Sequence, residues 1–339
     1  MDSVTQATLG AAIGVAVLGR RRPIWQAALS GAVVGTLPDL DVFLDKGDPV
    51  RNMVLHRAET HAFFWQALAA PVIAFLLATI TRSRDLLGRW VVMVLLTLFT
   101  HSLIDAITVY GTRIALPFSD HPFGVGSMFI IDPSYTLPLL LGVVMTLIWR
   151  SRSRLRWNTA GLLISTMYAG WSIAAQAHVT ELVMREPAAA GLERDQVLVT
   201  PTPFNTVLWR IVLRRDDTYQ EGFYSLLDRS VDPQRRIHFE TFERGGELDR
   251  RTADFADAQM IRDFSHGFYS LEDDGRQVWI TDLRMGQHPH YAFSFAFAEH
   301  HSEPLTAISP ERRRSRLPVD RGIDWLTRRI QGEAIPPPR

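Results

Sequence analysis

From Ala62 to Ile80 the chain contains no Asp, Glu, Lys or Arg, and the same is true from Trp90 to Phe99. Such runs suit the hydrocarbon core of a bilayer, which takes about 20 residues of helix to cross. Further apolar runs extend the pattern, and we expect about six membrane helices, at residues 5–19, 24–44, 62–80, 88–109, 135–149 and 157–178. The first and fifth are short and would require tilt, local thinning of the bilayer or partial insertion.

The character of the sequence changes near residue 180 of the 339. Before this point charges occur in short clusters, whereas after it they recur every few positions, as in a soluble domain. The segments 197–213 and 278–281 are strand candidates, alternating aromatic residues at 291–297 predict one packed sheet face, and 323–330 predicts an amphipathic helix. We therefore expect a mainly α protein with a polytopic membrane domain at 1–180 and a smaller α+β soluble domain at 181–339.

Arginine clusters follow the first, third and fifth expected helices. They comprise Arg20, Arg21 and Arg22, then Arg82, Arg84 and Arg89, and finally Arg150, Arg152, Arg154 and Arg156. By the positive-inside rule these loops face the cytoplasm. The loops 45–61 and 110–134 and the C-terminal domain would then lie on the periplasmic or outer side of a bacterial inner (plasma) membrane.

Composition narrows the functional classes. The absence of cysteine excludes disulfides, thiolate metal ligands and cysteine nucleophiles, so a metal site would have to use His, Asp, Glu or Gln. The net charge is zero and no large basic patch is visible, so we expect no nucleic-acid partner.

Ionisable residues occur at three expected helix ends that the predicted topology brings to one side. They are Asp39 and Asp41, His56 and His61, and His101 and Asp105. Residues at i and i+4, such as His101 and Asp105, project from one helical face, and Pro38 disturbs the preceding helix so that Asp39 and Asp41 could converge from a turn. Ionisable groups at membrane depth are costly and indicate function. Three imidazoles and three carboxylates suit one or two divalent ions, with Zn preferred and Mn or Fe as alternatives.

Each of these residues also has an ordinary structural interpretation. A histidine at a helix end is more often hydrogen-bonded than metal-bound, Asp39 could be a turn residue, and His101 could simply pair with Asp105. Six such residues on three helix ends are harder to explain as independent packing solutions. The metal hypothesis is therefore the stronger one.

Other polar residues are secondary candidates. Arg57 could orient a phosphate or carboxylate or be an interfacial arginine, and Glu59 could be a general base or a loop charge. Gln6 could reach the site with its amide oxygen. A second histidine group lacks accompanying Asp residues, and we do not expect it to bind metal; it contains His288, His290, His300 and His301.

Several short motifs in the first half of the chain resemble the bacterial membrane-bound metal-dependent hydrolases called YdjM-like. These motifs are Asp-Ser-Val-Thr-Gln-Ala-Thr-Leu-Gly-Ala-Ala at 2–12, Leu-Pro-Asp-Leu-Asp at 37–41, His-Arg-Ala-Glu-Thr-His at 56–61, Thr-His-Ser-Leu-Ile-Asp at 100–105, Tyr-Gly-Thr at 110–112, Pro-Phe-Ser at 117–119 and Ile-Asp-Pro at 131–133. The resemblance implies that the metal-binding set is Asp39, Asp41, His56, His61, His101 and Asp105. Many relatives have a histidine where this chain has Gln6, and Gly and Ser before the second histidine where it has Ala58, Glu59 and Thr60.

The expected function is hydrolysis by metal-activated water, with Glu59 and Arg57 as catalytic residues. The group resembles zinc-dependent phospholipase C distantly, which by analogy favours a phosphoester, lipid or lipid-linked substrate, and membrane lipids are the expected partners; protein partners are not indicated. The alternatives are a non-enzymatic membrane anchor or interaction protein with a structural metal, and a transporter. Transport sites usually lie near the bilayer midplane between repeats, whereas these residues cluster at one edge and no repeat is visible.

Overall fold

The computed structural model describes residues 1–149, 151, 153–228, 237–300, 305–313 and 319–339. Arg150, Arg152 and His301 therefore lie outside the described residues. The chain divides into two compact units, which are treated separately below. The first contains residues 1–44, 57–174 and 203–205, and the second contains 45–56, 175–202 and 206–339.

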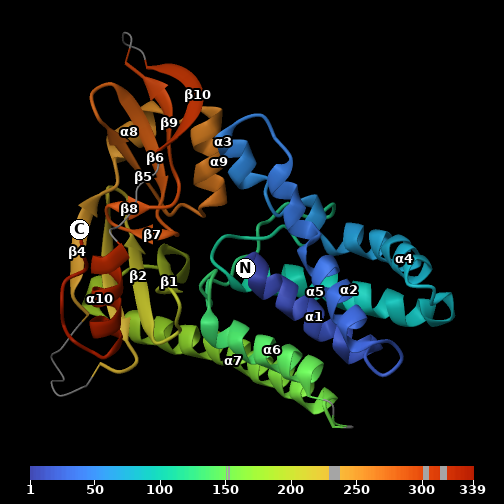
Figure 1. The fold of residues 1–339 in the computed structure, drawn as a ribbon. Coiled ribbons are helices and arrows are strands. Elements are labelled where there is room, and N and C mark those ends of the chain that lie inside the picture. Colours follow the sequence, from blue (N-terminus) through green and yellow to red (C-terminus); the bar gives the residue numbers. More distant parts are fainter. Residues whose placement is uncertain (150, 152, 229–236, 301–304, 314–318) are drawn as a thin grey trace. The chain divides into compact units, whose positions relative to one another are not determined.

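The first unit is helical (Figure 1). Its helices are α1 (Ser3–Leu18), α2 (Ile24–Thr36), α4 (Phe63–Ile80), α5 (Leu87–Ile107), α6 (Pro133–Ile148) and α7 (Leu155–Val183), the last of which continues into the second unit. Short 3₁₀ helices precede or follow them: η1 (Pro38–Phe43), η2 (Glu59–His61) and η3 (Arg84–Leu86). The helix ends agree with local signals, since the Asp2 side chain accepts hydrogen bonds from the first backbone amides of α1, and Pro133 occupies the first turn of α6.

Helices α1 and α2 cross at glycines. Gly10 and Gly14 on α1 face Gly31 and Gly35 on α2, so that the two backbones are in direct contact. A Cβ at Gly35, for example, would lie 2.6 Å from the carbonyl oxygen of Gln6. Small residues four apart allow this approach, which is common between helices in membranes because close van der Waals packing replaces the hydrophobic effect there. This crossing fixes the ends of both helices near the site described below.

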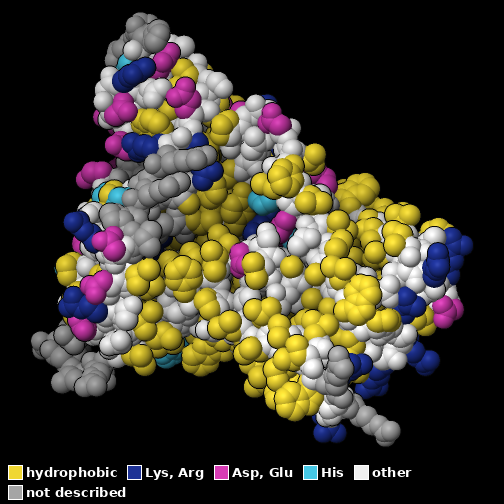
Figure 2. Space-filling view, in the orientation of Figure 1, with side chains coloured by type: hydrophobic (Ala, Val, Ile, Leu, Met, Phe, Trp, Pro, Cys, Tyr) yellow, Lys and Arg dark blue, Asp and Glu magenta, His cyan; other side chains and the backbone are white. Residues whose placement is uncertain are grey.

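Helix α4 packs on α5 through a narrow stripe of small side chains. Ala70, Ala74 and Ala78, spaced by four residues, are fully buried against a cluster that contains Trp90 and Met93 of α5. The other faces of α4 expose large apolar side chains, namely Phe64, Trp65, Leu68, Val72, Phe75, Leu76 and Ile80. Hydrophobic side chains gather over the helices of the first unit in Figure 2. A surface of this kind suits lipid rather than water.

The structure does not support six membrane helices. Among the described residues, two helical segments are long and apolar enough to cross a membrane, Phe63–Ile80 and Arg84–Ile107, and α1 and α6 are shorter apolar helices. The expected span at 24–44 is divided, because α2 ends at Thr36 and η1 begins at Pro38. Helix α7 is long, but polar residues such as Asn158 and Gln176 interrupt its apolar sequence.

The second unit is built mainly on β-sheet. One antiparallel sheet has the order β1-β2-β3-β4, a second has the order β10-β9-β6-β5, and β7 and β8 form a small hairpin. The strands are β1 (Val197–Pro201), β2 (Leu208–Arg214), β3 (Thr218–Ser225), β4 (Phe239–Glu243), β5 (Tyr269–Asp273), β6 (Gln277–Asp282), β7 (Gly286–Gln287), β8 (His290–Tyr291), β9 (Ser294–Glu299) and β10 (Thr306–Arg313). The helices are α3 (Pro49–Val54), α8 (Gly246–Arg251), α9 (Ala256–Phe264) and α10 (Val319–Ile330), and 3₁₀ turns lie at η4 (Pro187–Ala189) and η5 (Arg194–Gln196).

These elements confirm the strand candidates at 197–213 and 278–281 and the helix near 323–330. The prediction of one aromatic face across 291–297 was wrong, because the chain is not a continuous strand there. Tyr291 belongs to β8, whereas Phe295 and Phe297 lie on β9. On β9 the alternating Ala296 and Ala298 are buried as fully as the aromatic rings, so both strand faces are covered.

Candidate metal centre

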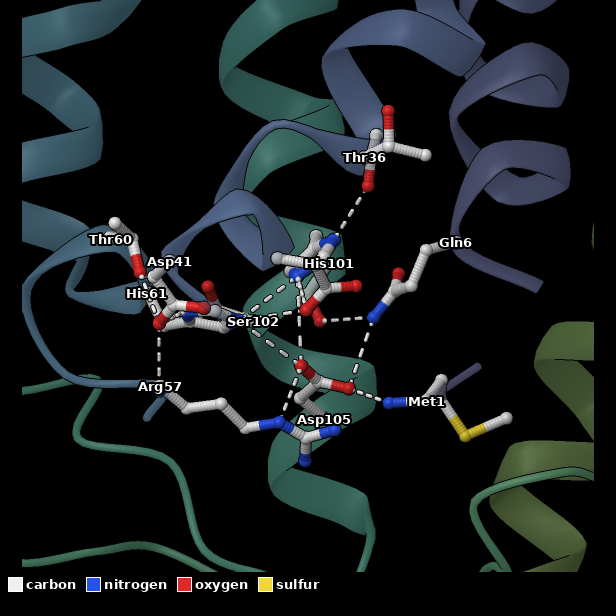
Figure 3. Close-up of polar contacts among 12 residues, drawn as sticks. Met1, Gln6, Thr36, Asp41, Arg57, Thr60, His61, His101, Ser102 and Asp105 are labelled. Carbon is white, nitrogen blue, oxygen red and sulfur yellow. Dashed lines mark hydrogen bonds and ion pairs between the residues drawn. The ribbon is translucent and has the colours of Figure 1, made fainter. Parts of the chain in front are cut away.

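Four side chains of the first unit converge: Asp39, His61, His101 and Asp105. One possible ligand atom of each lies within 4.8 Å of the others. The Nε2 atoms of the two histidines are 3.1 Å apart. His61 Nε2 lies 3.5 Å from Asp39 Oδ1 and 3.3 Å from Asp105 Oδ2, and the corresponding distances from His101 Nε2 are 3.5 and 3.6 Å. The labelled His61, His101 and Asp105 side chains point toward one another in Figure 3.

Local chain geometry explains how these residues meet. His101 and Asp105 are one turn apart on α5 and project from the same face. Asp39 is the second residue of η1, which begins at Pro38 shortly after α2, and His61 is the last residue of η2, shortly before α4. The site is therefore held by the ends of packed helices, which restricts the motion of its members.

Hydrogen bonds on the outer side of each imidazole direct its Nε2 atom inward. The Nδ1–H group of His101 donates to the carbonyl oxygen of Gly35 at 2.7 Å. His61 Nδ1 lies 2.8 Å from the Thr60 hydroxyl, which itself donates to Asp41 Oδ2 at 3.1 Å. Since the Thr60 proton is directed to Asp41, the His61 Nδ1–H group is the donor to Thr60. Both rings thus present Nε2 lone pairs to the centre, the arrangement by which proteins orient metal-binding histidines.

The donor set fits a divalent metal ion. Two lone pairs that face each other at 3.1 Å repel unless a cation lies between them. The five histidine-containing distances among the four atoms run from 3.1 to 3.6 Å, close to the spacing of about 3.3 Å between ligands of a tetrahedral ion such as zinc. The two carboxylates would balance the charge of a divalent ion. The group could therefore bind a metal ion through its nitrogen and oxygen donors.

The Asp105 carboxylate is oriented by neighbours on three sides. Its Oδ1 accepts a hydrogen bond from Gln6 Nε2 at 3.1 Å and contacts the amino group of Met1. Its Oδ2 is buried and lies 3.3 Å from both Arg57 Nε and His61 Nε2. A buried carboxylate needs cationic partners, and a metal ion would be a further one.

The electrostatics of the cluster favour positive charge at its centre. Burial alone would raise the pKa of Asp39, but hydrogen bonds with His101 and His61 hold that pKa below its usual range. Burial alone would lower the pKa of His61, but Asp105 and Asp39, which accept hydrogen bonds from the protonated ring, raise it. Both shifts arise because imidazoles and carboxylates lie close together, an arrangement that favours positive charge between them.

The remaining residues of the predicted metal set are placed differently. Asp41 is buried, and its Oδ2 accepts hydrogen bonds from the backbone amide of Arg57 at 3.0 Å and from Thr60. It lies on the outer side of the His61 ring, 3.9 Å from Nδ1, and Thr60 links the two by hydrogen bonds. His56 belongs to the second compact unit and is not among the four grouped residues.

The predicted catalytic residues also differ from each other. The Arg57 side chain is buried between Asp105 and the Thr108 hydroxyl, 3.3 Å from each, and stacks over Tyr110. Its backbone has a φ of 60°, an uncommon conformation for a residue other than glycine, which brings its amide to Asp41. Glu59 is exposed and is not one of the four grouped residues.

Sequence reasoning missed the residues that orient the ligands. Thr60, the Gly35 carbonyl, and Gln66, which bonds both Thr60 O and Ser102 Oγ, had no distinguishing pattern. Gln6 does contact the site, through its amide nitrogen rather than the expected oxygen. In the second histidine group, His288 stacks on Phe242 and His300 bonds Asp273.

The first unit defines a class of helical membrane protein with a buried Asp/His group at its helix ends. The YdjM inner membrane protein family matches residues 1–179, more than half of the chain. The chain therefore belongs to this family, as its sequence motifs indicated. Comparisons with curated proteins and with solved structures gave no match.

Proposed function

We propose that this protein is a membrane-bound metal-dependent hydrolase whose metal is held by Asp39, His61, His101 and Asp105. The observation that carries the proposal is the pair of histidine Nε2 atoms facing each other at 3.1 Å with two carboxylates around them. A bound divalent ion would supply a water whose pKa is lowered to about 7 and would polarise the scissile group. The donor set has no feature specific to redox chemistry.

The protein's own residues would control access and charge. The side chain of Asp39 is 18% exposed, whereas those of the other three members are at most 1% exposed, so water and substrate would approach beside Asp39. Arg57 balances the charge of Asp105 and holds its carboxylate in place. Glu59, exposed at the start of η2, is the proposed proton acceptor.

We favour a phosphoester in a lipid or lipid-linked substrate. Large apolar side chains lie beside the acidic residues of η1. Four of them are each more than half exposed: Leu40, Val42, Phe43 and Leu44. Exposed apolar groups beside the Asp39 entrance would contact lipid favourably. This surface supports membrane lipids as partners and a substrate that remains embedded by its tail.

Chelation should abolish hydrolysis, and Asp39→Ala should lower it by about 100-fold or more, because loss of a metal ligand should cost more than loss of an outer partner. The measurement is a screen of phosphoesters, lipids and amides with native protein in detergent or vesicles, with chelator-treated protein, and with the variant. His300→Ala, which alters a histidine outside the group, is the control and should retain full activity. Hydrolysis that survives both chelation and Asp39→Ala would refute catalysis at this site.

A structural metal in a membrane anchor is the second candidate, because four protein donors suffice to close a tetrahedral site. X-ray absorption or a metal-loaded structure would distinguish the two. A catalytic site keeps a position for water, whereas a saturated shell of four protein ligands would favour the anchor. Coupled transport of an ion would instead require a path through the bilayer.

We further propose that the C-terminal part lies on the periplasmic or outer side of the inner membrane. The arginines that follow the first and third expected helices, such as Arg20 and Arg82, would then face the cytoplasm. A reporter active only in the cytoplasm, fused after Arg339, should give no signal, and one active only in the periplasm should give a strong one. The reverse pattern would show the opposite orientation.

A further inference from the structure

A carboxylate in the second unit is buried between two guanidinium groups. Glu221 on β3 pairs with Arg210 on β2 at 2.6 Å, and both side chains are almost completely buried. Arg210 also donates to the carbonyl oxygen of Leu283 at 2.8 Å. Glu221 additionally accepts the His288 amide at 3.2 Å. The carboxylate is therefore fixed and already neutralised by Arg210 before any second cation approaches.

The second guanidinium belongs to Arg339, far away in sequence. Its Nη1 atom lies 3.1 Å from Glu221 Oε1 and donates to the carbonyl oxygen of His288, while Nη2 donates to Glu240 Oε2 at 2.6 Å. The group also lies 5.0 Å from the centre of the Phe242 ring, which stacks on His288. The site therefore offers three acceptor oxygens and an aromatic face. The planar donors of a guanidinium fit this arrangement better than the compact charge of an ammonium does.

The residues before Arg339 lie in the same region without regular secondary structure. Gln287 Nε2 donates to the carbonyl oxygen of Pro338 at 3.3 Å, and Trp325 Nε1 donates to that of Ile335 at 3.4 Å. Ile335 packs against the apolar cluster around Trp325. The three prolines at 336–338 have no N–H groups and favour an extended conformation, so this segment is bound by its carbonyls and by two anchor side chains.

We propose that the surface formed by Glu221, Glu240, Phe242, Gln287 and His288 is a recognition site for an arginine-bearing, proline-rich extended peptide segment. Residues 335–339 fill this site as a tethered ligand. The mode resembles the binding of proline-rich peptides to aromatic grooves, in which a preformed extended backbone lowers the entropic cost. Tethering raises the local concentration of the segment, so an external segment would compete with it only when the tether is weakened.

The test uses the full chain with Arg339→Gln and an acetylated, amidated peptide of sequence Ala-Ile-Pro-Pro-Pro-Arg, labelled for fluorescence anisotropy. The variant should bind this peptide at least about 100-fold more tightly than the wild-type protein, whose site is filled. Peptides with lysine or glutamine in place of the arginine should bind the variant at least about 10-fold more weakly, because neither presents a planar guanidinium. Adding Glu240→Gln to this variant should weaken its binding of the arginine peptide. Glu240 is 33% exposed, so the change should leave the buried Arg210–Glu221 pair intact.

Two outcomes would overturn the proposal. Equal binding of the three peptides would show that arginine is not recognised, and absence of binding to a folded Arg339→Gln variant would show that the segment is only a packing element. Circular dichroism of the variant establishes that it is folded. Hydrogen exchange of residues 331–335 gives a second readout, since loss of Arg339 should speed exchange at their amides if the guanidinium anchors the segment.

Discussion

Replacing His101 by alanine is expected to abolish stoichiometric binding of a divalent transition metal. The substitution removes one of the four possible donors and leaves three, His61 and the carboxylates of Asp39 and Asp105. Loss of an outer hydrogen-bond partner costs a metal site roughly 10- to 100-fold in affinity, and loss of a ligand should cost more. Metal content of protein purified in detergent, measured by mass spectrometry after dialysis against a weak chelator, checks this directly.

His56→Ala is the matched control, because His56 belongs to the set implied by family resemblance but not to the four residues that converge. It should retain a full equivalent of metal. Retained metal in His101→Ala would remove the four-residue site from consideration. Loss of metal in His56→Ala with an intact fold would instead show that the larger set predicted from the sequence operates.

Much of this site could be anticipated from local sequence. The spacing of His101 and Asp105 places them on one helical face whatever the rest of the chain does. Pro38 indicated that the helix expected over 24–44 would be disturbed around Asp39, and the structure has a 3₁₀ helix that begins at Pro38. The sequence could not show that Asp39 joins the group while Asp41 does not. This difference depends on the tertiary path of residues 57–60, whose amide and hydroxyl groups donate hydrogen bonds to Asp41.

For the fold, too, features set by local sequence could be predicted and features set by tertiary contacts could not. Residue types that favour strands, such as Val, Thr and Trp, located the strands around 197–213 and 278–281, since this signal is local. Hydropathy overestimated the number of membrane helices because an apolar run does not show where a helix ends. The run at 24–44 contains the α2–η1 junction, and the interruption between Tyr291 and Ser294 depends on sheet pairing that no local pattern encodes.

Gly31→Ala is expected to destabilise the protein and to weaken metal binding together. A methyl group at this position would overlap the backbone carbonyl oxygen of Gly10, so α1 and α2 would have to separate. Overpacking typically costs about 1–3 kcal/mol, and a clash with backbone should reach the upper end because no rotamer change relieves it. The displacement would also reach Gly35, one turn along α2, whose carbonyl oxygen accepts the His101 hydrogen bond.

Gly170→Ala supplies the matched control, because it makes the same change within helix α7 at a position where an added Cβ meets nothing within 4 Å. This variant should unfold at the wild-type temperature or slightly above, since alanine is favoured over glycine in a helix by roughly 0.5–1 kcal/mol. Thermal unfolding in detergent and metal titration of the two variants and the wild type give the comparison. If Gly31→Ala matched Gly170→Ala in both measurements, the glycine crossing could not be what holds the Gly35 carbonyl against His101, and the orientation of that ligand would have to depend on α5 alone.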